Sequence, residues 1–187
     1  LIVLVILFQD QIKRFLIDIG SHSHIDQLKR VFHHSAKDTK SYHNLIMAIV
    51  YACLSMSKSK TGALICLQRK VPLGDYEKTG DIIDADINTR LIENIFFKNS
   101  PLHDGAMIIA HRRIAAVGCI LPVSHDMHLP KHLGLRHRAA LGMSQASDAL
   151  CVVVSEETGN ISVAKDGIMT TNITSSDLEK QLSNIFG

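Results

Sequence analysis

Residues 100–121, SPLHDGAMIIAHRRIAAVGCIL, decide the fold of this chain. Two apolar runs, Ala106–Ala110 and Ile114–Leu121, are separated only by the polar residues at positions 111–113. Short apolar runs bounded by polar residues are typical of buried β-strands, and so short a connection is typical of a tight turn. The stretch therefore predicts two strands joined as a hairpin.

A second strand pair and several helices surround this hairpin. Leu150–Val154 and Ile161–Ala164 repeat the pattern across a polar turn, and Ala63–Leu67 is a further apolar run of strand length. Strand pairs with helices between them predict an α/β fold, in which a mixed β-sheet is surrounded by helices. Apolar spacing and helix-forming residues predict these helices at Phe8–Ile19, Leu45–Leu54, Asn88–Phe97, Leu135–Ser144 and Asp177–Phe186.

The composition excludes several classes of protein. With 187 residues, of which 46% are hydrophobic and 20% charged, the chain can build its own core. The net charge is only +2 and the basic residues are scattered, so we expect no nucleic-acid partner, although an anionic small molecule is compatible. The four cysteines lie far apart without a CxxC pair, which indicates reduced core residues rather than a zinc or redox site. They are Cys53, Cys66, Cys119 and Cys151.

The N-terminal region has the pattern of neither a membrane span nor a signal peptide. The apolar run Leu1–Phe8 is much shorter than the roughly 20 residues that cross a bilayer, and it lacks a basic start. We therefore interpret the chain as a piece of a longer protein whose preceding segment could span a membrane. An ordinary buried helix or strand is the alternative for this run. The His-rich stretch Ser21–Lys40 has no supporting frame of cysteines or carboxylates, so we interpret it as a polar linker rather than a metal site.

Three clusters of polar residues lie beside the expected strands, where functional side chains are common. The first is His103-Asp104-Gly105-Ala106, in which two small residues follow a carboxylate. Small residues leave the backbone amides open to a phosphate or a ribose. The alternative is a turn in which Asp104 caps its own backbone.

The second cluster is Arg136-His137-Arg138, at the expected start of a helix after Gly134. Two guanidinium groups beside a helix N-terminus form an anion site, because backbone amides, the helix dipole and forked donors all favour phosphate oxygens. The alternative is a solvated basic turn.

The third cluster is Ser155-Glu156-Glu157, directly after the apolar run Leu150–Val154. Carboxylates at the end of a strand can bind a divalent cation or pair with arginines, and a serine can donate to a phosphate. The alternative is an ordinary polar hairpin turn.

Four segments in this order, SPLHDGAMII, IAAVGCILPVS, LGLRHRAALG and SDALCVVVSEETG, resemble the DAC domain of diadenylate cyclases, especially the membrane-anchored bacterial class. The resemblance runs from about Thr61 to Ile168. It implies a catalytic domain at residues 61–187 and, at residues 1–60, a helical segment that follows a membrane region and packs on that domain. The implied reaction joins two ATP molecules into cyclic di-AMP with release of two pyrophosphates, across a face-to-face homodimer.

The resemblance also implies a role for each cluster. Asp104 assists the ribose 3′-hydroxyl, while His103 and Glu157 are candidate ligands of a divalent metal, Mg²⁺, Mn²⁺ or Co²⁺. A metal is needed because a ribose hydroxyl is a poor nucleophile and a carboxylate is a weak base toward it. The ATP-binding set implied by the resemblance is Gly105, Ala106, Leu135, Arg136, His137, Arg138, Ser155 and Glu156.

One position departs from the family pattern, and two other functions stay open. The RHR motif is usually preceded by threonine, whose hydroxyl can reach the nucleotide, whereas this chain has Leu135 and depends on backbone amides there. A non-catalytic adenine-nucleotide sensor and a metal-dependent nucleotide hydrolase are the alternatives. The resemblance places the catalytic domain in the cytoplasm, with membrane contact only through a preceding segment, and leaves open a regulatory protein partner.

Overall fold

The computed structural model describes residues 36–126, 130 and 133–186. The chain divides into two compact units, residues 1–39 and 40–187, and of the first unit only the start of helix α4 is described. The expected helix Phe8–Ile19 and most of the stretch Ser21–Lys40 therefore lie outside the described residues. No helix in the described ranges is long and apolar enough to cross a membrane.

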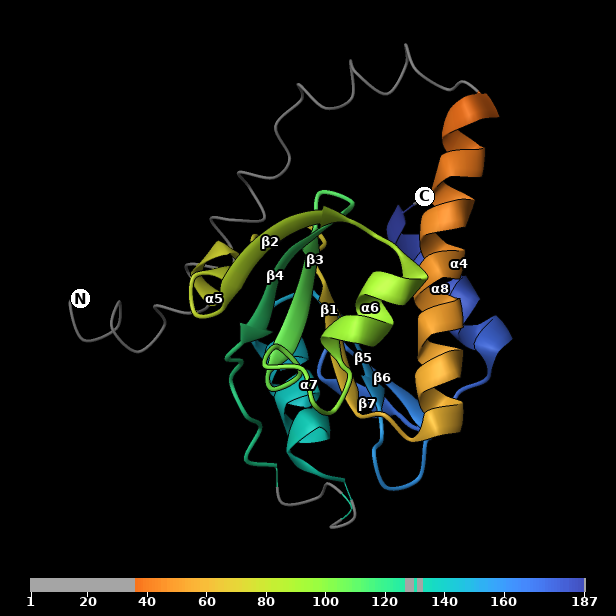
Figure 1. Cartoon of the computed structure of the whole chain (residues 1–187). Coiled ribbons are helices and arrows are strands. Elements are labelled where there is room, and N and C mark those ends of the chain that lie inside the picture. Colours follow the sequence, from red (N-terminus) through yellow and green to blue (C-terminus); the bar gives the residue numbers. More distant parts are fainter. Residues whose placement is uncertain (1–35, 127–129, 131–132, 187) are drawn as a thin grey trace, which may run out of the picture. The chain divides into compact units, whose positions relative to one another are not determined.

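The second unit is built on one seven-stranded sheet with the strand order β2-β4-β3-β1-β5-β6-β7 (Figure 1). Strands β1 and β3 pair in parallel, and the other neighbouring strands of the described sheet pair antiparallel. This arrangement confirms the predicted mixed sheet. The strands are β1 Ala63–Leu67, β2 Asp81–Asp86, β3 Ala106–Ala110, β4 Arg113–Cys119, β5 Leu150–Val154, β6 Ile161–Lys165 and β7 Ile168–Thr170.

Helices cover both faces of the sheet. Apolar side chains of α4, α6 and α8 form one core with one face, and those of α7 and α5 form a second core with the other face. Because both faces are covered, every residue of the central strands β1, β3 and β5 is buried. The helices are α4 Ala36–Ser59, α5 Gly74–Glu77, α6 Thr89–Ile95, α7 Leu135–Ala146 and α8 Ser175–Phe186.

Both predicted hairpins are confirmed. Strands β3 and β4 are joined by His111 and Arg112, whose φ values of 50° and 64° give the left-handed turn that suits a two-residue connection. Strands β5 and β6 pair in the same antiparallel manner. Helix α7 begins at the expected residue, Leu135, after the N-cap Gly134.

Three short elements, α5, β2 and β7, fall outside the apolar pattern. Strand β2 contains three aspartates and is an outermost strand of the sheet, so most of its residues are exposed. Long-range contacts hold it in place, because β2 pairs antiparallel with β4, whose Arg113 also bonds to Asp84 and Asp86. A local apolar pattern cannot reveal a strand that is stabilised in this way.

All four cysteines are free and buried, as expected for core residues. Cys66 and Cys151 are cross-strand partners with their Sγ atoms 3.0 Å apart. Burial raises the pKa of Cys53 to about 12 and the pKa of Cys119 to about 11. Thiols held protonated in this way are poor nucleophiles and poor metal ligands.

Candidate functional site

The sheet topology brings two of the three polar clusters to one edge. Strands β1 and β3 are parallel and begin at the same edge, while β5 runs antiparallel to β1 and ends there, with Val154 opposite Ala63. The residues just before β1 and β3 and just after β5 therefore share this edge. Since neighbouring strands lie about 4.8 Å apart, β3 and β5 are separated by roughly 10 Å. We call this region, made of Gly62, residues 103–106, residues 155–159 and the first turn of α7, the site edge.

The Asp104-Gly105 pair requires glycine at its second position. Gly105 has a φ of 92°, and a Cβ atom there would lie 2.6 Å from the carbonyl carbon of Gly118 on β4. Only glycine tolerates both the left-handed backbone and this close approach. Asp104 is exposed, and its Oδ1 accepts a hydrogen bond of 3.0 Å from the N–H of Gly105. This bond reaches only the adjacent amide, whereas an Asx turn uses the amide two residues on, and the carboxylate is exposed to solvent.

His103 is oriented by the backbone. Its Nδ1 lies 2.7 Å from the carbonyl oxygen of Ser100, which can only accept, so Nδ1 is the donor and Nε2 is the ring nitrogen left for another partner. Metal-binding histidines usually donate the N–H of one ring nitrogen to a carbonyl or carboxylate group and bind the metal through the other nitrogen.

The first turn of α7 presents its residues in different environments. Leu135 is 76% exposed, whereas His137 is buried and already engaged in an interaction. Arg138 is half-buried, and its Nη1 donates to the backbone oxygen of Asp126 at 3.3 Å. Only part of the RHR motif is therefore open to solvent.

Arg136 connects the second cluster with the third. Its Nη1 lies 2.8 Å from Oε2 of Glu156, in an ion pair in which the arginine side chain is 23% exposed. A Cβ atom at Gly62 would lie 2.6 Å from that Nη1 and 3.0 Å from that Oε2. The glycine before β1 therefore leaves the space that the ion pair occupies.

Gly62 is a site residue that the sequence motifs did not single out. The dipeptide Thr61-Gly62 reads only as the boundary of a strand, and the contact with Arg136 joins residues far apart in the chain. The one local signal is a glycine directly before a fully buried strand, which often marks the close approach of another group.

The loop that follows β5 is a compact turn. The side-chain oxygen of Ser155 accepts a hydrogen bond of 3.2 Å from the N–H of Thr158. The carbonyl oxygen of Ser155 accepts one of 2.9 Å from the N–H of Gly159. Glu156 and Glu157 are exposed on this turn. The expected hairpin turn and the exposed carboxylates thus occur together.

No group of three or more histidine, cysteine or carboxylate side chains able to hold a metal occurs among the described residues. His103 and Glu157 lie beside strands that flank β1 on its two sides. Mg²⁺ is usually bound by one or two protein groups together with substrate phosphates and water, so a pair of protein ligands is compatible with a metal carried by a nucleotide.

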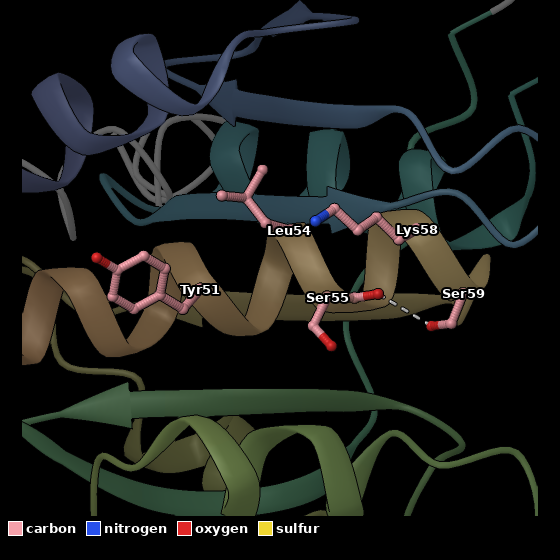
Figure 2. Close-up of a pocket in the computed structure, with 5 residues that line it drawn as sticks. All are labelled: Tyr51, Leu54, Ser55, Lys58 and Ser59. Carbon is pink, nitrogen blue, oxygen red and sulfur yellow. Dashed lines mark hydrogen bonds between the residues drawn. The ribbon is translucent and has the colours of Figure 1, made fainter.

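A surface hollow lies along α4 (Figure 2). It is lined by Tyr51, Leu54, Ser55, Lys58 and Ser59, and Ser59 donates within the helix to the carbonyl oxygen of Ser55 at 3.1 Å. None of the residues expected in the site lines it. An open hollow beside a single helix offers no convergent set of charged groups, so the site edge is the stronger candidate.

Comparisons with known proteins agree with the resemblance of the motifs. Residues 50–169 match the family model described as DAC, DisA bacterial checkpoint controller nucleotide-binding. The chain is 39% identical over 184 residues to the cyclic di-AMP synthase CdaA of Bacillus subtilis, covering 98% of this chain and 65% of that protein. It is 36% identical over 143 residues to the diadenylate cyclase of Mycoplasma genitalium, covering 76% and 71%.

Two solved structures share the fold. The crystal structure of a double mutant of DacA from Staphylococcus aureus superposes with a TM-score of 0.77 at 43% identity, covering 79% of this chain and 98% of that one. A hypothetical membrane spanning protein from Bacillus cereus gives a TM-score of 0.65 at 32% identity, covering 91% and 80%. The chain therefore spans about two thirds of the Bacillus subtilis relative and nearly all of the Staphylococcus aureus chain.

Proposed function

The chain belongs to the DAC family, and from this membership we propose that it condenses two ATP molecules into cyclic di-AMP with release of two pyrophosphates. The observation that carries the proposal is the site edge, where Asp104, the Arg136–Glu156 ion pair and the Ser155 turn surround the start of β1. The names of the Bacillus subtilis and Mycoplasma genitalium relatives, both synthases of this class, support it.

Asp104 acts on the ribose. Each 3′-hydroxyl must attack the α-phosphorus of the other ATP, so that a new ester bond forms while the bond to the β-phosphate oxygen breaks and pyrophosphate leaves. The exposed Asp104 carboxylate orients the hydroxyl and accepts its proton as the bond forms. The hydrogen bond from the N–H of Gly105 fixes one carboxylate oxygen and so limits the orientations of the other.

Phosphate oxygens are held by the first turn of α7 and by Arg136. Backbone N–H groups at a helix N-terminus attract anions, and a guanidinium has five donors, so Arg136 can keep Glu156 and still contact a phosphate. Arg138, His137, Ser155, Gly105, Ala106 and the backbone of Leu135 complete the proposed ATP site.

His103 and Glu157 are the proposed ligands of a divalent cation, Mg²⁺, Mn²⁺ or Co²⁺, bound with the triphosphate. The orientation of His103 by Ser100 and the exposure of Glu157 fit this role. Such a cation would neutralise phosphate charge and polarise the α-phosphate.

The reaction needs two copies of the chain, because each holds one ATP and the two must face each other. We therefore propose a homodimer joined across the two site edges. We also propose that residues 61–187 form the catalytic domain and residues 1–60 a helical segment leading to a membrane-anchored region, with catalysis in the cytoplasm. The description of the Bacillus cereus protein as membrane spanning supports this arrangement.

Incubation of the purified chain with ATP and each of the three metals, followed by chromatography and mass spectrometry, tests the proposal. Cyclic di-AMP is the expected product. ATP that binds but does not react would favour the nucleotide sensor, and release of ADP or AMP would identify a hydrolase.

A further inference from the structure

Helix α4 ends at the site edge with a defined capping motif. The N–H of Thr61 donates to the carbonyl oxygen of Met56 at 2.8 Å, and the N–H of Lys60 donates to that of Ser57 at 3.3 Å. These two bonds are those of a Schellman cap, in which Lys60 occupies the position after the C-cap. Its φ of 52° lies in the left-handed region, as this motif requires.

Lysine is an unfavourable residue at this position. Glycine adopts the left-handed conformation without steric cost and is the usual residue there, whereas a lysine destabilises the cap. Because a lysine held in this conformation is strained, we ask what its side chain does. Lys60 is exposed, so its side chain does not contribute to the core.

The side chain of Lys60 lies beside the loop that carries Ser155, Glu156 and Glu157. Ser57 binds this loop to α4, since its Oγ donates to the carbonyl oxygen of Gly159 at 2.6 Å. The Cγ of Lys60 lies 3.6 Å from the place that a Cβ on Gly159 would take. The loop after β5 is thus in contact with the last turn of α4.

The same segment also reaches the arginine of the site. Two residues after Lys60, Gly62 lies under the Arg136–Glu156 ion pair, with 2.6 Å between its Cβ position and the guanidinium. Lys60 and Arg136 therefore stand at the same edge of the sheet, beside the same loop. Two flexible cations placed around one turn match the charge of a triphosphate or of a departing pyrophosphate.

We propose that Lys60 is a further phosphate-binding residue of this site. It contacts the triphosphate from the end of α4, whereas the N-terminus of α7 contacts it from the other face of the sheet. This inference rests on the proposed function and adds a residue that neither the motifs nor the anion site of α7 supplies. Its distinctive consequence is that stability and substrate affinity move in opposite directions when Lys60 becomes glycine.

The test uses three variants at position 60 in the full chain. Lys60→Gly removes both the charge and the strain, so the Tm should rise by about 2 °C while the KM for ATP rises about fivefold. Lys60→Gln removes the charge and keeps the strain, so the KM should rise equally with little change in Tm. Lys60→Arg should retain the KM of the wild type.

Two controls come from the opposite edge of the sheet. Asp166 has the same φ of 52°, so Asp166→Gly should raise the Tm without changing the KM. Lys165→Gln removes an equivalent positive charge at the end of β6 and should leave the KM unchanged. If Lys60→Gly raises the Tm but the two uncharged variants, Lys60→Gly and Lys60→Gln, keep the wild-type KM, Lys60 only ends the helix and the proposal is wrong. A wild-type chain that forms no cyclic di-AMP would instead contradict the proposed function, and the dissociation constant for ATP would then replace the KM in the comparison.

Discussion

The two edges of the central sheet both carry charged residues, but they use them differently. At the edge opposite the site edge, charges form hydrogen bonds within the fold. Arg113 pairs with Asp84 and Asp86, each at 2.5 Å, and Asp148 accepts from two backbone N–H groups at 3.0 and 3.1 Å. Arg112 there also lies over the ring of Tyr42, with its guanidinium carbon 4.3 Å from the ring centre. These groups join separate segments of the chain.

At the site edge, fewer of the charged groups have a partner elsewhere in the described part of the fold. Asp104 and Glu157 are exposed, and the one ion pair there that the described residues form, Arg136–Glu156, has its carboxylate partner 64% exposed. Exposure alone does not separate the two edges, since the side chains of Asp84 and Asp86 are 73% and 89% exposed. What separates them is that Asp104 bonds only to the adjacent amide among the described residues, so its exposed carboxylate contributes little to stability and is accessible to a ligand. The contrast indicates that substitutions at the opposite edge should change stability, and substitutions at the site edge should change activity.

The largest expected effect is the loss of activity in Asp104→Asn. The amide cannot accept the proton of the 3′-hydroxyl, so formation of cyclic di-AMP should fall at least about 100-fold. The Tm and the dissociation constant for ATP should stay close to the wild type. Asp104 is exposed, and within the described residues its side chain bonds only to the N–H of Gly105. Product formation by mass spectrometry and ATP binding by calorimetry measure the two quantities.

Asp75→Asn is the matched control, since Asp75 is an equally simple exposed carboxylate on α5 that pairs with Lys78. It should retain full activity. Unchanged turnover in Asp104→Asn would remove Asp104 from the mechanism.

The next largest effect is expected at the opposite edge, where Asp148→Ala should lower stability rather than activity. Asp148→Ala leaves the backbone N–H groups of Lys70 and Val71 without their acceptor, which should lower the free energy of unfolding by about 2 kcal/mol. The kcat/KM of the remaining folded protein should not change. Urea denaturation gives the first value and initial rates the second; a large loss of kcat/KM with intact stability would contradict the division between the two edges.

The fold could be predicted from the sequence where burial is continuous. Strands β1, β3 and β5 are buried along their whole length, so their apolar runs were sufficient. Strand β2 could not be predicted, because it is exposed and acidic and depends on its pairing with β4, which begins more than 25 residues later in the chain. Local composition carries no information about such a partner.

The sequence motifs predicted which polar clusters form the candidate site, but not the contacts between residues that are far apart in the chain. The positions of Asp104 and Ser155 at strand ends follow from the apolar runs beside them, and the topology then brings them to one edge. Gly62 and Lys60 have no motif, since their relevance comes from Arg136 and Gly159, each more than 70 residues away. The roles of His137 and Arg138 toward phosphate stay predictions.

Arg138→Ala should weaken ATP binding about tenfold, the loss expected for one charge-assisted contact with a phosphate. Arg138 also donates to the backbone of Asp126, so the Tm must be measured beside the dissociation constant. Arg90→Ala, which removes an exposed arginine from α6, is the charge-matched control and should change neither value. If Arg138→Ala lowers the Tm while the dissociation constant is unchanged, the arginine only anchors the neighbouring loop.

The smallest expected effect is a gain, in Leu135→Thr. Leu135 is 76% exposed at the first position of α7, so its removal costs little packing, and a threonine hydroxyl there could donate to the nucleotide. ATP affinity should rise about threefold, as one neutral hydrogen bond would give. Leu135→Val has the shape of threonine without the hydroxyl and should leave affinity unchanged. An equal gain in both variants would mean that the size of Leu135, rather than the missing hydroxyl, limits binding at the site edge.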